Sequence, residues 1–391
     1  MPRGGSRPDD LDYGLPVAVD PSRFGGARPE AVRGGRMRSG AKQAVVIAGA
    51  GAAVAVAVKV ADPEVRAEFR RLRQFGRPLD NAAGGPPVPP PLPPGRIVPV
   101  AGVGELFVRD SGGAGRPAVL LLHGWGATAD ANFFTTYPAL VDAYRVVAVD
   151  HRGHGRGLRA AAPFTLEDCA DDAAALLSEL GIDRAVLVGY SMGGPVALLM
   201  AHRHPERVAG LVLEATALEF NAGLRERVVW RGLTVLEAAL RHGAGDGVVQ
   251  RVLREAIDRQ PALVPYRAWI AGEFRRGHVT EIVEAGRALS RFDARRFVAA
   301  IDQPAAAIVT SKDRLVPPRK QRELAAALNA ITFELRGDHD APIIEDAFGP
   351  LTHAAVDHVA TRAGLMTIQP ADDRVTDLTA DAIRPVRQVW R

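Results

Sequence analysis

The sequence predicts an α/β protein from about Ile97 onward, on three observations. Short apolar runs alternate with stretches of helical periodicity, which is typical of this class. Several runs are apolar throughout, as expected of strands buried on both faces of a parallel sheet. One run leads directly into a glycine-rich turn and then a helical stretch. The predicted strands are Glu105–Arg109, Ala118–Leu122, Arg145–Val149, Ala185–Val188, Gly210–Leu213, Ala305–Thr310 and Ala330–Leu335, and the predicted helices are Leu166–Leu180, Met192–His204, Pro318–Leu328 and Glu345–Thr361.

The composition is that of a globular protein. The 391 residues are enough for two domains or for one large domain with extensions. A hydrophobic content of 47% and a charged content of 24% are ordinary. The one cysteine, Cys169, excludes an internal disulfide, and its place in a helical pattern predicts a small core residue.

The net charge of +4 is unevenly distributed along the chain. Residues 1–95 hold 14 Lys/Arg against 9 Asp/Glu, whereas the remainder holds 35 against 36. The near-neutral remainder lacks the basic footprint of a nucleic-acid-binding protein, so we expect no nucleic-acid partner.

The composition of the N-terminal part predicts a membrane anchor. Residues 1–43 are rich in Gly, Arg, Pro and Asp, and we expect a disordered basic segment. Residues 44–61 form an apolar run that as a helix would span about 27 Å, close to the ~30 Å hydrocarbon core of a bilayer. We therefore expect a membrane-anchor helix and a membrane-associated protein. A cleaved signal peptide and a soluble helix are open alternatives, which would make the protein secreted or cytoplasmic.

Residues 62–95 combine an amphipathic helix with a proline-rich linker. Asp62-Pro63 is a helix start, and the apolar residues after it recur at helical spacing among several arginines. Such a helix suits an anionic membrane surface, and packing against the body of the protein fits it equally well. Pro86–Pro94 predicts an extended spacer of roughly 28 Å.

A helical cap is predicted within the α/β domain, which we place at residues 96–365. Residues 217–300 interrupt the alternation, with helical periods and no clear strand pattern. Their aromatic residues are equally suited to line a pocket or to fill the core of the cap: Phe220, Trp230, Trp269 and Phe274. Residues 366–391 are predicted to be a C-terminal tail with no assigned role.

The stretch Gly189-Tyr190-Ser191-Met192-Gly193 carries the strongest signal for chemistry. It lies between an apolar run and a helical stretch, which is the context in which G-x-S-x-G forms a nucleophile elbow. Small residues two before and two after the serine allow a sharp turn and close packing of strand and helix. The alternative is an ordinary serine in a Gly-rich turn, and we predict that Ser191 is a nucleophile.

A serine nucleophile needs a base. His339 follows the predicted strand that ends near Leu335, and it lies in a short polar loop. Two rivals, His353 and His358, fall in a helical pattern and are poorer candidates. The alternative role of His339 is that of a surface loop residue.

The base in turn needs an acid that orients it. Asp313 lies a few residues past the strand Ala305–Thr310 and precedes His339 by 26 residues, which leaves room for one helix and one strand. Glu214 is the runner-up at another strand end, and capping the next helix is the alternative role of Asp313. Asp338 and Asp340 adjoin the histidine in sequence and are badly placed to orient its ring.

The oxyanion donors are predicted to be two backbone N–H groups. One belongs to Met192, the residue after the nucleophile. The other follows an early strand, within His123-Gly124-Trp125-Gly126, and Trp125 is the best candidate. The order serine, acid, histidine along the chain differs from that of chymotrypsin-like and subtilisin-like enzymes.

These motifs resemble those of the α/β-hydrolase fold superfamily, in its branch of serine esterases, lipases and haloperoxidase-like enzymes, from about Ile97 to Leu365. The resemblance implies an eight-stranded, mostly parallel sheet with a helical cap insertion. Serine in place of an aspartate nucleophile argues against dehalogenase and epoxide hydrolase activity. The segments that carry the resemblance are His123–Gly126, Asp150–Gly155, Gly189–Gly194 and the loops of Asp313 and His339. The resemblance gives the Asp150–Gly155 loop a structural role.

We therefore expect a serine hydrolase that cleaves an acyl ester through an acyl-enzyme, without cofactor or metal. Its substrate would be a small-molecule acyl ester or a lipid. A C–C bond hydrolase, a haloperoxidase-like perhydrolase and an acyltransferase use the same triad, and the fold does not separate them. A non-catalytic binding protein is a further alternative, although such proteins usually lose a member of the triad.

Overall fold

The computed structural model describes residues 88–366, except 161, 222, 224, 225, 228, 229 and 231–260. The predictions for residues 1–43 and 44–61, for most of 62–95 and for nearly all of the tail at 366–391 lie outside the described residues. No helix in the described part is long and apolar enough to cross a membrane.

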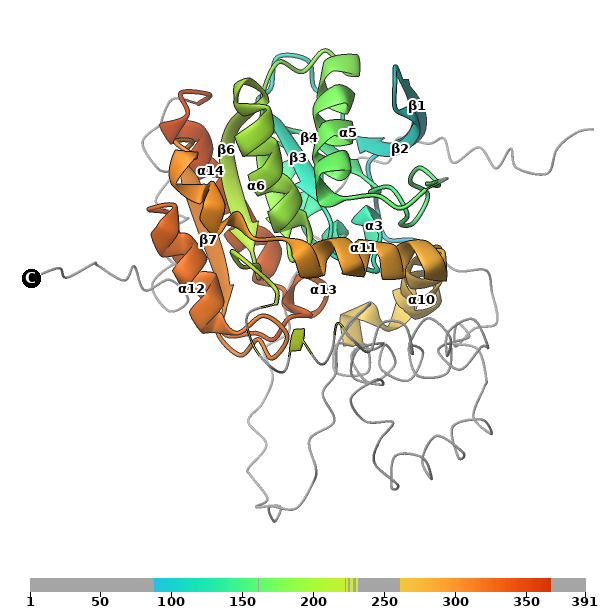
Figure 1. Cartoon of the computed structure of the whole chain (residues 1–391). Coiled ribbons are helices and arrows are strands. Elements are labelled where there is room, and N and C mark those ends of the chain that lie inside the picture. Colours follow the sequence, from blue (N-terminus) through green and yellow to red (C-terminus); the bar gives the residue numbers. More distant parts are fainter. Residues whose placement is uncertain are drawn as a thin grey trace, which may run out of the picture. The chain divides into compact units, whose positions relative to one another are not determined.

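The core of the structure is one eight-stranded sheet (Figure 1). Its strand order is β1-β2-β4-β3-β5-β6-β7-β8, with β1 and β2 antiparallel to their neighbours and all later pairs parallel. The strands are β1 (Gly95–Val100), β2 (Gly104–Asp110), β3 (Ala118–Leu122), β4 (Arg145–Val149), β5 (Ala185–Tyr190), β6 (Val208–Glu214), β7 (Ala305–Thr310) and β8 (Ile331–Leu335). The predicted fold class is confirmed.

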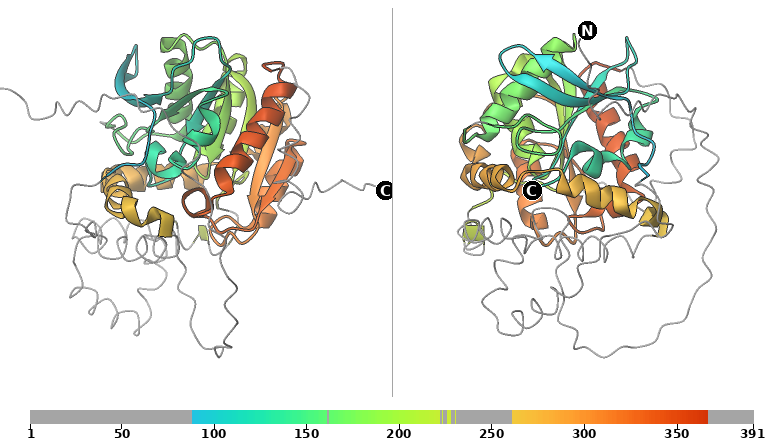
Figure 2. Two further views of the ribbon diagram at one scale, coloured as in Figure 1. Left: turned by 180° about the vertical axis from the view of Figure 1, so that it is seen from behind. Right: turned by 90° about the vertical axis from the view of Figure 1, so that its right-hand side faces the viewer.

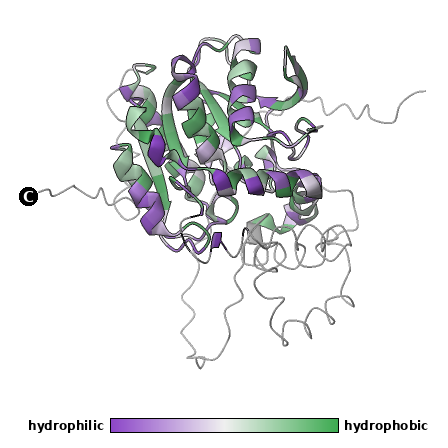
Figure 3. Cartoon of the chain, in the orientation of Figure 1, coloured by the Kyte–Doolittle hydropathy of each residue, from purple (hydrophilic) through white to green (hydrophobic). Residues whose placement is uncertain are grey.

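Helices cover both faces of the sheet because the central strands are apolar on both sides. Strands β3, β5, β6 and β7 are buried at every position. One face packs on α5 (Leu166–Glu179) and α6 (Gly193–Arg203), and the other packs on α4 (Tyr137–Leu140) and α14 (Phe348–Arg362), as Figures 1 and 2 show. In Figure 3 the central strands are mostly hydrophobic, while the helices around them carry many hydrophilic residues. Cys169 in α5 is a buried core residue, as predicted.

The insertion between β6 and β7 is mainly helical in its described part from Pro261 onward. It contains a 3₁₀ segment (Pro261–Tyr266), α10 (Arg267–Arg275) and α11 (Val279–Arg291), followed by two short 3₁₀ turns. An isolated bridge between Glu219 and Asp293 joins its two ends. The expected helical cap is therefore present, while the exact domain boundaries stay a prediction.

The structure differs from the sequence prediction mainly in short elements. Strand β1 was not predicted because most of its residues are exposed and it contains a proline. Three helices of four or five residues were also not predicted, since a single turn has no periodicity to detect: α3 (Ala129–Phe133), α4 (Tyr137–Leu140) and α13 (Ala341–Ile344). The predicted helix Glu345–Thr361 begins later, at Phe348.

Candidate active site

Ser191 lies at the tip of a strained turn between β5 and α6. Its φ is +52°, in the left-handed region that non-glycine residues rarely occupy. The turn is tight, because a Cβ added to Gly193 would lie 1.9 Å from the carbonyl oxygen of Leu122. The Ser191 N–H donates to the carbonyl of Glu214 at 2.9 Å, and its own carbonyl accepts from the hydroxyl of Thr216 at 2.7 Å. These contacts fix the backbone that presents the hydroxyl.

The structure brings His339 between Ser191 and Asp313. His339 Nε2 lies 3.0 Å from Ser191 Oγ, and Nδ1 lies 2.8 Å from Asp313 Oδ2. A carboxylate only accepts, so the hydrogen bonds assign the ring proton to Nδ1 and leave Nε2 as an acceptor for the serine proton. All three side chains come from loops at the carboxyl ends of parallel strands, and all three are buried.

Asp313 is held by four further hydrogen bonds. Its Oδ1 accepts from the N–H groups of Leu315 and Val316, both at 2.8 Å. Its Oδ2, which faces the histidine, also accepts from the Thr310 hydroxyl at 2.9 Å and the Gln321 amide at 3.1 Å. The carboxylate is therefore fixed in one orientation.

The loop that carries His339 is pinned from both sides. The hydroxyl of Tyr190 donates to the His339 carbonyl, and the two rings lie 5.3 Å apart. Asp338 accepts from the His339 N–H at 2.9 Å and pairs with Arg314. Tyr190 thus ties the elbow directly to the histidine, a role that its place in G-x-S-x-G does not reveal.

Charge and burial act oppositely on the pKa of His339. Burial alone would lower this pKa, but the Asp313 carboxylate beside the ring and its hydrogen bond, with the Asp340 and Asp338 charges, bring it above the ordinary value. The site therefore stabilises the imidazolium that forms when this base takes up the serine proton.

The runner-up residues lie away from this arrangement. The Glu214 side chain points to α14, where its Oε1 accepts from the Thr352 hydroxyl at 2.6 Å. Burial raises the pKa of Glu214 to about 8. His353 and His358 lie on α14, and His353 pairs with Asp357 in the next turn.

One of the two predicted oxyanion donors lies within the elbow, and the other lies in the loop after β3. Met192 precedes the first residue of α6. Trp125 follows Gly124, and a Cβ added to that glycine would lie 3.3 Å from the Cβ of Ser191. Within the described ranges, neither the Trp125 nor the Met192 backbone N–H donates to a protein acceptor. Both groups are thus available near the serine, and their role stays a prediction.

Three buried histidines support the loop before Trp125. His123 Nε2 accepts from the His151 N–H at 2.9 Å, and its Nδ1 lies 2.8 Å from the Gly124 carbonyl. The His123 ring lies 4.4 Å from that of His151 and 5.2 Å from that of His154. Burial lowers the pKa of all three, to about 4 for His123 and about 3 for His154, so they are neutral at pH 7. Among the described residues, no group of three His, Cys, Asp or Glu side chains is placed to hold a metal ion.

The aromatic residues of the cap divide into two groups. Phe220, Trp269 and Phe274 are buried in hydrophobic clusters. The Trp230 ring lies 5.5 Å from that of Trp125, and the Trp125 indole N–H donates to the carbonyl of Ile282 at 2.6 Å. The cap therefore contacts the loop beside the serine through aromatic packing and a hydrogen bond.

A family model described as alpha/beta hydrolase fold matches residues 117–345. This range contains Ser191, Asp313 and His339.

Several named relatives each match part of the chain. A pimeloyl-[acyl-carrier protein] methyl ester esterase of Neisseria meningitidis (serogroup A) is 32% identical over 206 residues, covering 51% of this chain and 63% of the relative. A 2-hydroxymuconate semialdehyde hydrolase of Pseudomonas sp. is 42% identical over 126 residues, covering 32% and 44%. The acetyltransferase component of an acetoin cleaving system of Pseudomonas putida is 37% identical, covering 37% and 38%. The chain thus spans less than two thirds of the length of these three relatives.

Solved structures share the fold over about two thirds of the chain. An enol-lactonase from Burkholderia xenovorans is 26% identical, with a TM-score of 0.56, covering 67% of this chain and all of the other. A thermophilic esterase from Thermogutta terrifontis is 22% identical, with a TM-score of 0.57, covering 69% of this chain and 99% of the other. At such identities the likeness to the esterase concerns the fold alone.

Proposed function

Because this chain belongs to the alpha/beta hydrolase fold family, we propose that it is a serine hydrolase that cleaves an acyl ester. The observation that carries the proposal is the contact of one imidazole with both partners, at 3.0 Å to Ser191 and 2.8 Å to Asp313. A matched relative named as a methyl ester esterase supports the choice of an ester.

Catalysis proceeds in two displacements. Ser191 Oγ attacks the ester carbonyl while His339 Nε2 takes its proton, and the Trp125 and Met192 N–H groups receive the negative charge on the carbonyl oxygen. The alcohol leaves with the proton from His339, and an acyl-enzyme on Ser191 remains. Water then attacks this acyl group, His339 again accepts and returns the proton, and the carboxylic acid is released. Asp313 stays ionised and stabilises the imidazolium in both halves.

A fluorophosphonate probe tests the nucleophile. We expect the probe to label the full chain and Ser191→Ala to abolish labelling, because the activated hydroxyl is the group that forms the covalent bond. Ester hydrolysis by this variant should fall by roughly 10⁴-fold or more. The matched control is Ser178→Ala on α5, whose hydroxyl bonds only within its own helix. Labelling that persists in Ser191→Ala, or absence of labelling in the parent chain, would contradict the proposal.

A substrate series ranks the alternatives that use the same triad. We expect p-nitrophenyl esters to be hydrolysed, with a preferred chain length set by the cap. A higher rate with a C–C bond substrate, with peroxide as the acyl acceptor, or with an alcohol or thiol acceptor would assign the site to a C–C bond hydrolase, a perhydrolase or an acyltransferase instead.

A further inference from the structure

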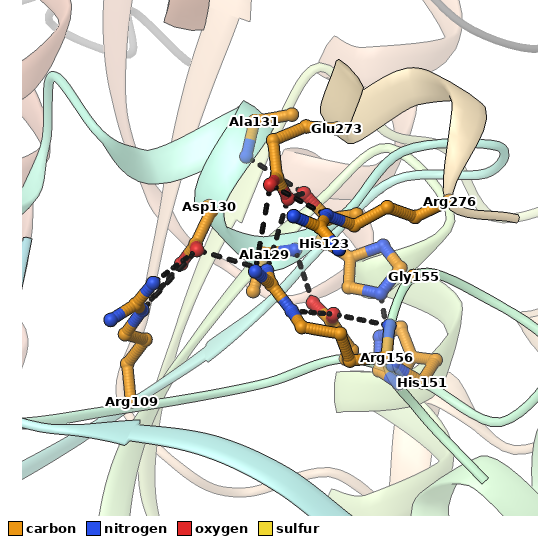
Figure 4. A network of polar contacts seen from close by, with 12 residues as sticks. Arg109, His123, Ala129, Asp130, Ala131, His151, Gly155, Arg156, Glu273 and Arg276 are labelled. Atoms are coloured by element: carbon orange, nitrogen blue, oxygen red, sulfur yellow. Dashed lines mark hydrogen bonds and ion pairs between the residues drawn. The ribbon is translucent and has the colours of Figure 1, made fainter. Parts of the chain in front are cut away.

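A buried cluster of charged side chains joins the cap to the body beside the candidate site. Its centre is Arg156, in the loop after β4, which contacts three carboxylates (Figure 4). Its guanidinium lies 2.9 Å from Asp130, 3.2 Å from Asp150 and 3.0 Å from Glu273. The three acids come from α3, the end of β4 and the cap helix α10, and none is more than 1% exposed at its side chain.

The geometry of this charged cluster suits an arginine better than a lysine. Arg109 and Arg276 neutralise the acids from the outer sides, pairing with Asp130 and Glu273 at 2.8 Å each. Among the described residues, Arg156 is the cation that contacts all three acids. Its guanidinium also lies 4.0 Å from the centre of the Phe107 ring. A planar group with five donors can bridge several carboxylates at once, whereas the ammonium of lysine is a point charge.

The cluster reaches α3 through its first turn. The Thr128 hydroxyl donates to Glu273 at 2.9 Å and, as the N-cap of α3, accepts from the Ala131 N–H at 3.0 Å. The Ala129 N–H donates to Asp150 at 2.8 Å. The cap helix and the loop after β4 therefore both determine where α3 begins.

From α3 the contacts continue to the loop beside the nucleophile. Asn132 accepts from the Gly124 N–H at 2.8 Å, and Gly124 packs directly against Ser191. The next residue is Trp125, whose indole N–H is bonded to Ile282 of α11. Gly124, which precedes the candidate oxyanion donor, is thus linked to α10 through the charged cluster, and Trp125 itself is bonded to α11.

We propose that Arg156 and Glu273 are positioning residues, which transmit the seating of cap helix α10 through α3 to the Trp125 N–H. The inference rests on the proposed serine hydrolase function and adds to it a coupling between the cap and the loop that carries the Trp125 N–H. Buried ion pairs contribute little net stability but strongly restrict geometry, since any other arrangement leaves a charge unpaired. The cluster therefore serves alignment more than stability.

The test compares two ion pairs whose arginines, Arg152 and Arg156, both lie in the loop after β4. Glu273→Gln keeps the shape of the cap residue and removes its charge. The matched control is Asp172→Asn. Asp172 lies on helix α5 and pairs at 2.5 Å with Arg152, which precedes Arg156 by four residues. This ion pair therefore joins the same loop to α5 and not to the cap. We measure steady-state kcat and KM with a p-nitrophenyl ester, the rate of fluorophosphonate labelling, and Tm for each variant.

We expect Glu273→Gln to lower kcat and the labelling rate by roughly ten- to a hundred-fold, as misplacement of a catalytic group on the order of 1 Å does. KM should change much less, because the lost interaction is made in the transition state. Asp172→Asn should lower Tm to a similar extent and leave kcat unchanged. Arg156→Lys should retain part of the activity, since it keeps the charge but not the bridging geometry.

A milder pair of variants covers the case in which the charge variants do not fold. Thr128→Val removes the hydroxyl that joins Glu273 to α3, whereas Thr128→Ser retains it. We expect Val to lower kcat by more than the modest fall in Tm from the lost N-cap bond explains, and Ser to restore both. Loss of activity in proportion to Tm in all variants, the control included, would overturn the coupling. Failure of the parent chain to be labelled would instead overturn the proposed function.

Discussion

At His339, burial and the Asp313 charge oppose each other, and the balance sets the acid limb of the activity profile. The base acts only when its imidazole is neutral, and its pKa lies above the ordinary value near 6.5. We therefore expect kcat/KM to fall as the pH drops through that raised pKa. Asp313→Asn removes the charge that raises the pKa, so the limb should move to lower pH while kcat falls by about 10⁴-fold.

The measurement is a pH profile of kcat/KM for the parent chain, Asp313→Asn and His353→Gln. His353 is a partly exposed histidine on α14 that pairs with Asp357, so its removal should leave the limb unchanged. An acid limb that stays in place in Asp313→Asn, or moves in His353→Gln, would assign the titration to another group.

Site residues that directly follow a recognisable strand could be predicted from the sequence. Site residues that reach the triad from another element could not. Ser191, Asp313 and His339 each follow a recognisable strand, so their common edge of the sheet was predictable. Gln321 reaches Asp313 from the second turn of a helix, and Tyr190 reaches His339 across the elbow. Neither contact leaves a signal in sequence spacing. The contact of Thr310 with Asp313 was closer to predictable, because a hydroxyl at the end of a buried strand needs a partner.

Strand β6 carries a buried acid whose ionisation should govern the pH dependence of stability. The folded pKa of Glu214 is about 8, against an ordinary value of 4.5. Below pH 4.5 the group is neutral in both states. Between the two values the unfolded chain loses the proton and the folded chain keeps it, so the free energy of unfolding falls as pH rises. Complete linkage over this range corresponds to a loss of about 5 kcal/mol.

Glu214→Gln should remove most of this slope, because the amide stays neutral and can still accept from Thr352. Urea unfolding from pH 5 to pH 8 measures the effect. Glu179→Gln, at an exposed position on α5, is the control and should unfold with the parent slope. Equal slopes for Glu214→Gln and the parent chain would mean that the buried acid does not control stability.

Among whole elements, burial on both faces decided which could be predicted. Strands β3, β4, β5 and β7 stood out as continuous apolar runs, and the structure places them within a residue or two of prediction. Strand β1 lies at the sheet edge, where four of its six residues are exposed, so no apolar run marks it. The cap was predictable as a helical interruption. Its attachment through Glu273 was not, because that contact joins residues more than a hundred positions apart.

On the scale of the whole molecule, charge and hydropathy separate the N-terminal part from the near-neutral body. The first 95 residues hold the basic excess and the apolar run of residues 44–61. We propose that this run anchors the protein in a membrane, with the proline-rich linker between anchor and body. The full chain should then sediment with membranes and resist extraction by high salt or alkaline carbonate, which release proteins held only by a basic amphipathic helix.

The matched soluble form should begin at Val88 and not at Gly95. Arg109 donates to the carbonyl of Pro93, and the Asp110 N–H donates to that of Pro94, so a shorter chain would lose contacts of the body. We expect the chain from Val88 to stay in the supernatant with unchanged kcat. Val54→Asp in the full chain places a charge in the apolar run and should release it, because a charge at the bilayer centre costs about 2.5 kcal/mol or more, whereas Val54→Leu should not. A parent chain found wholly in the soluble fraction would overturn the anchor, and a chain shortened after residue 61 in cells would favour a cleaved signal.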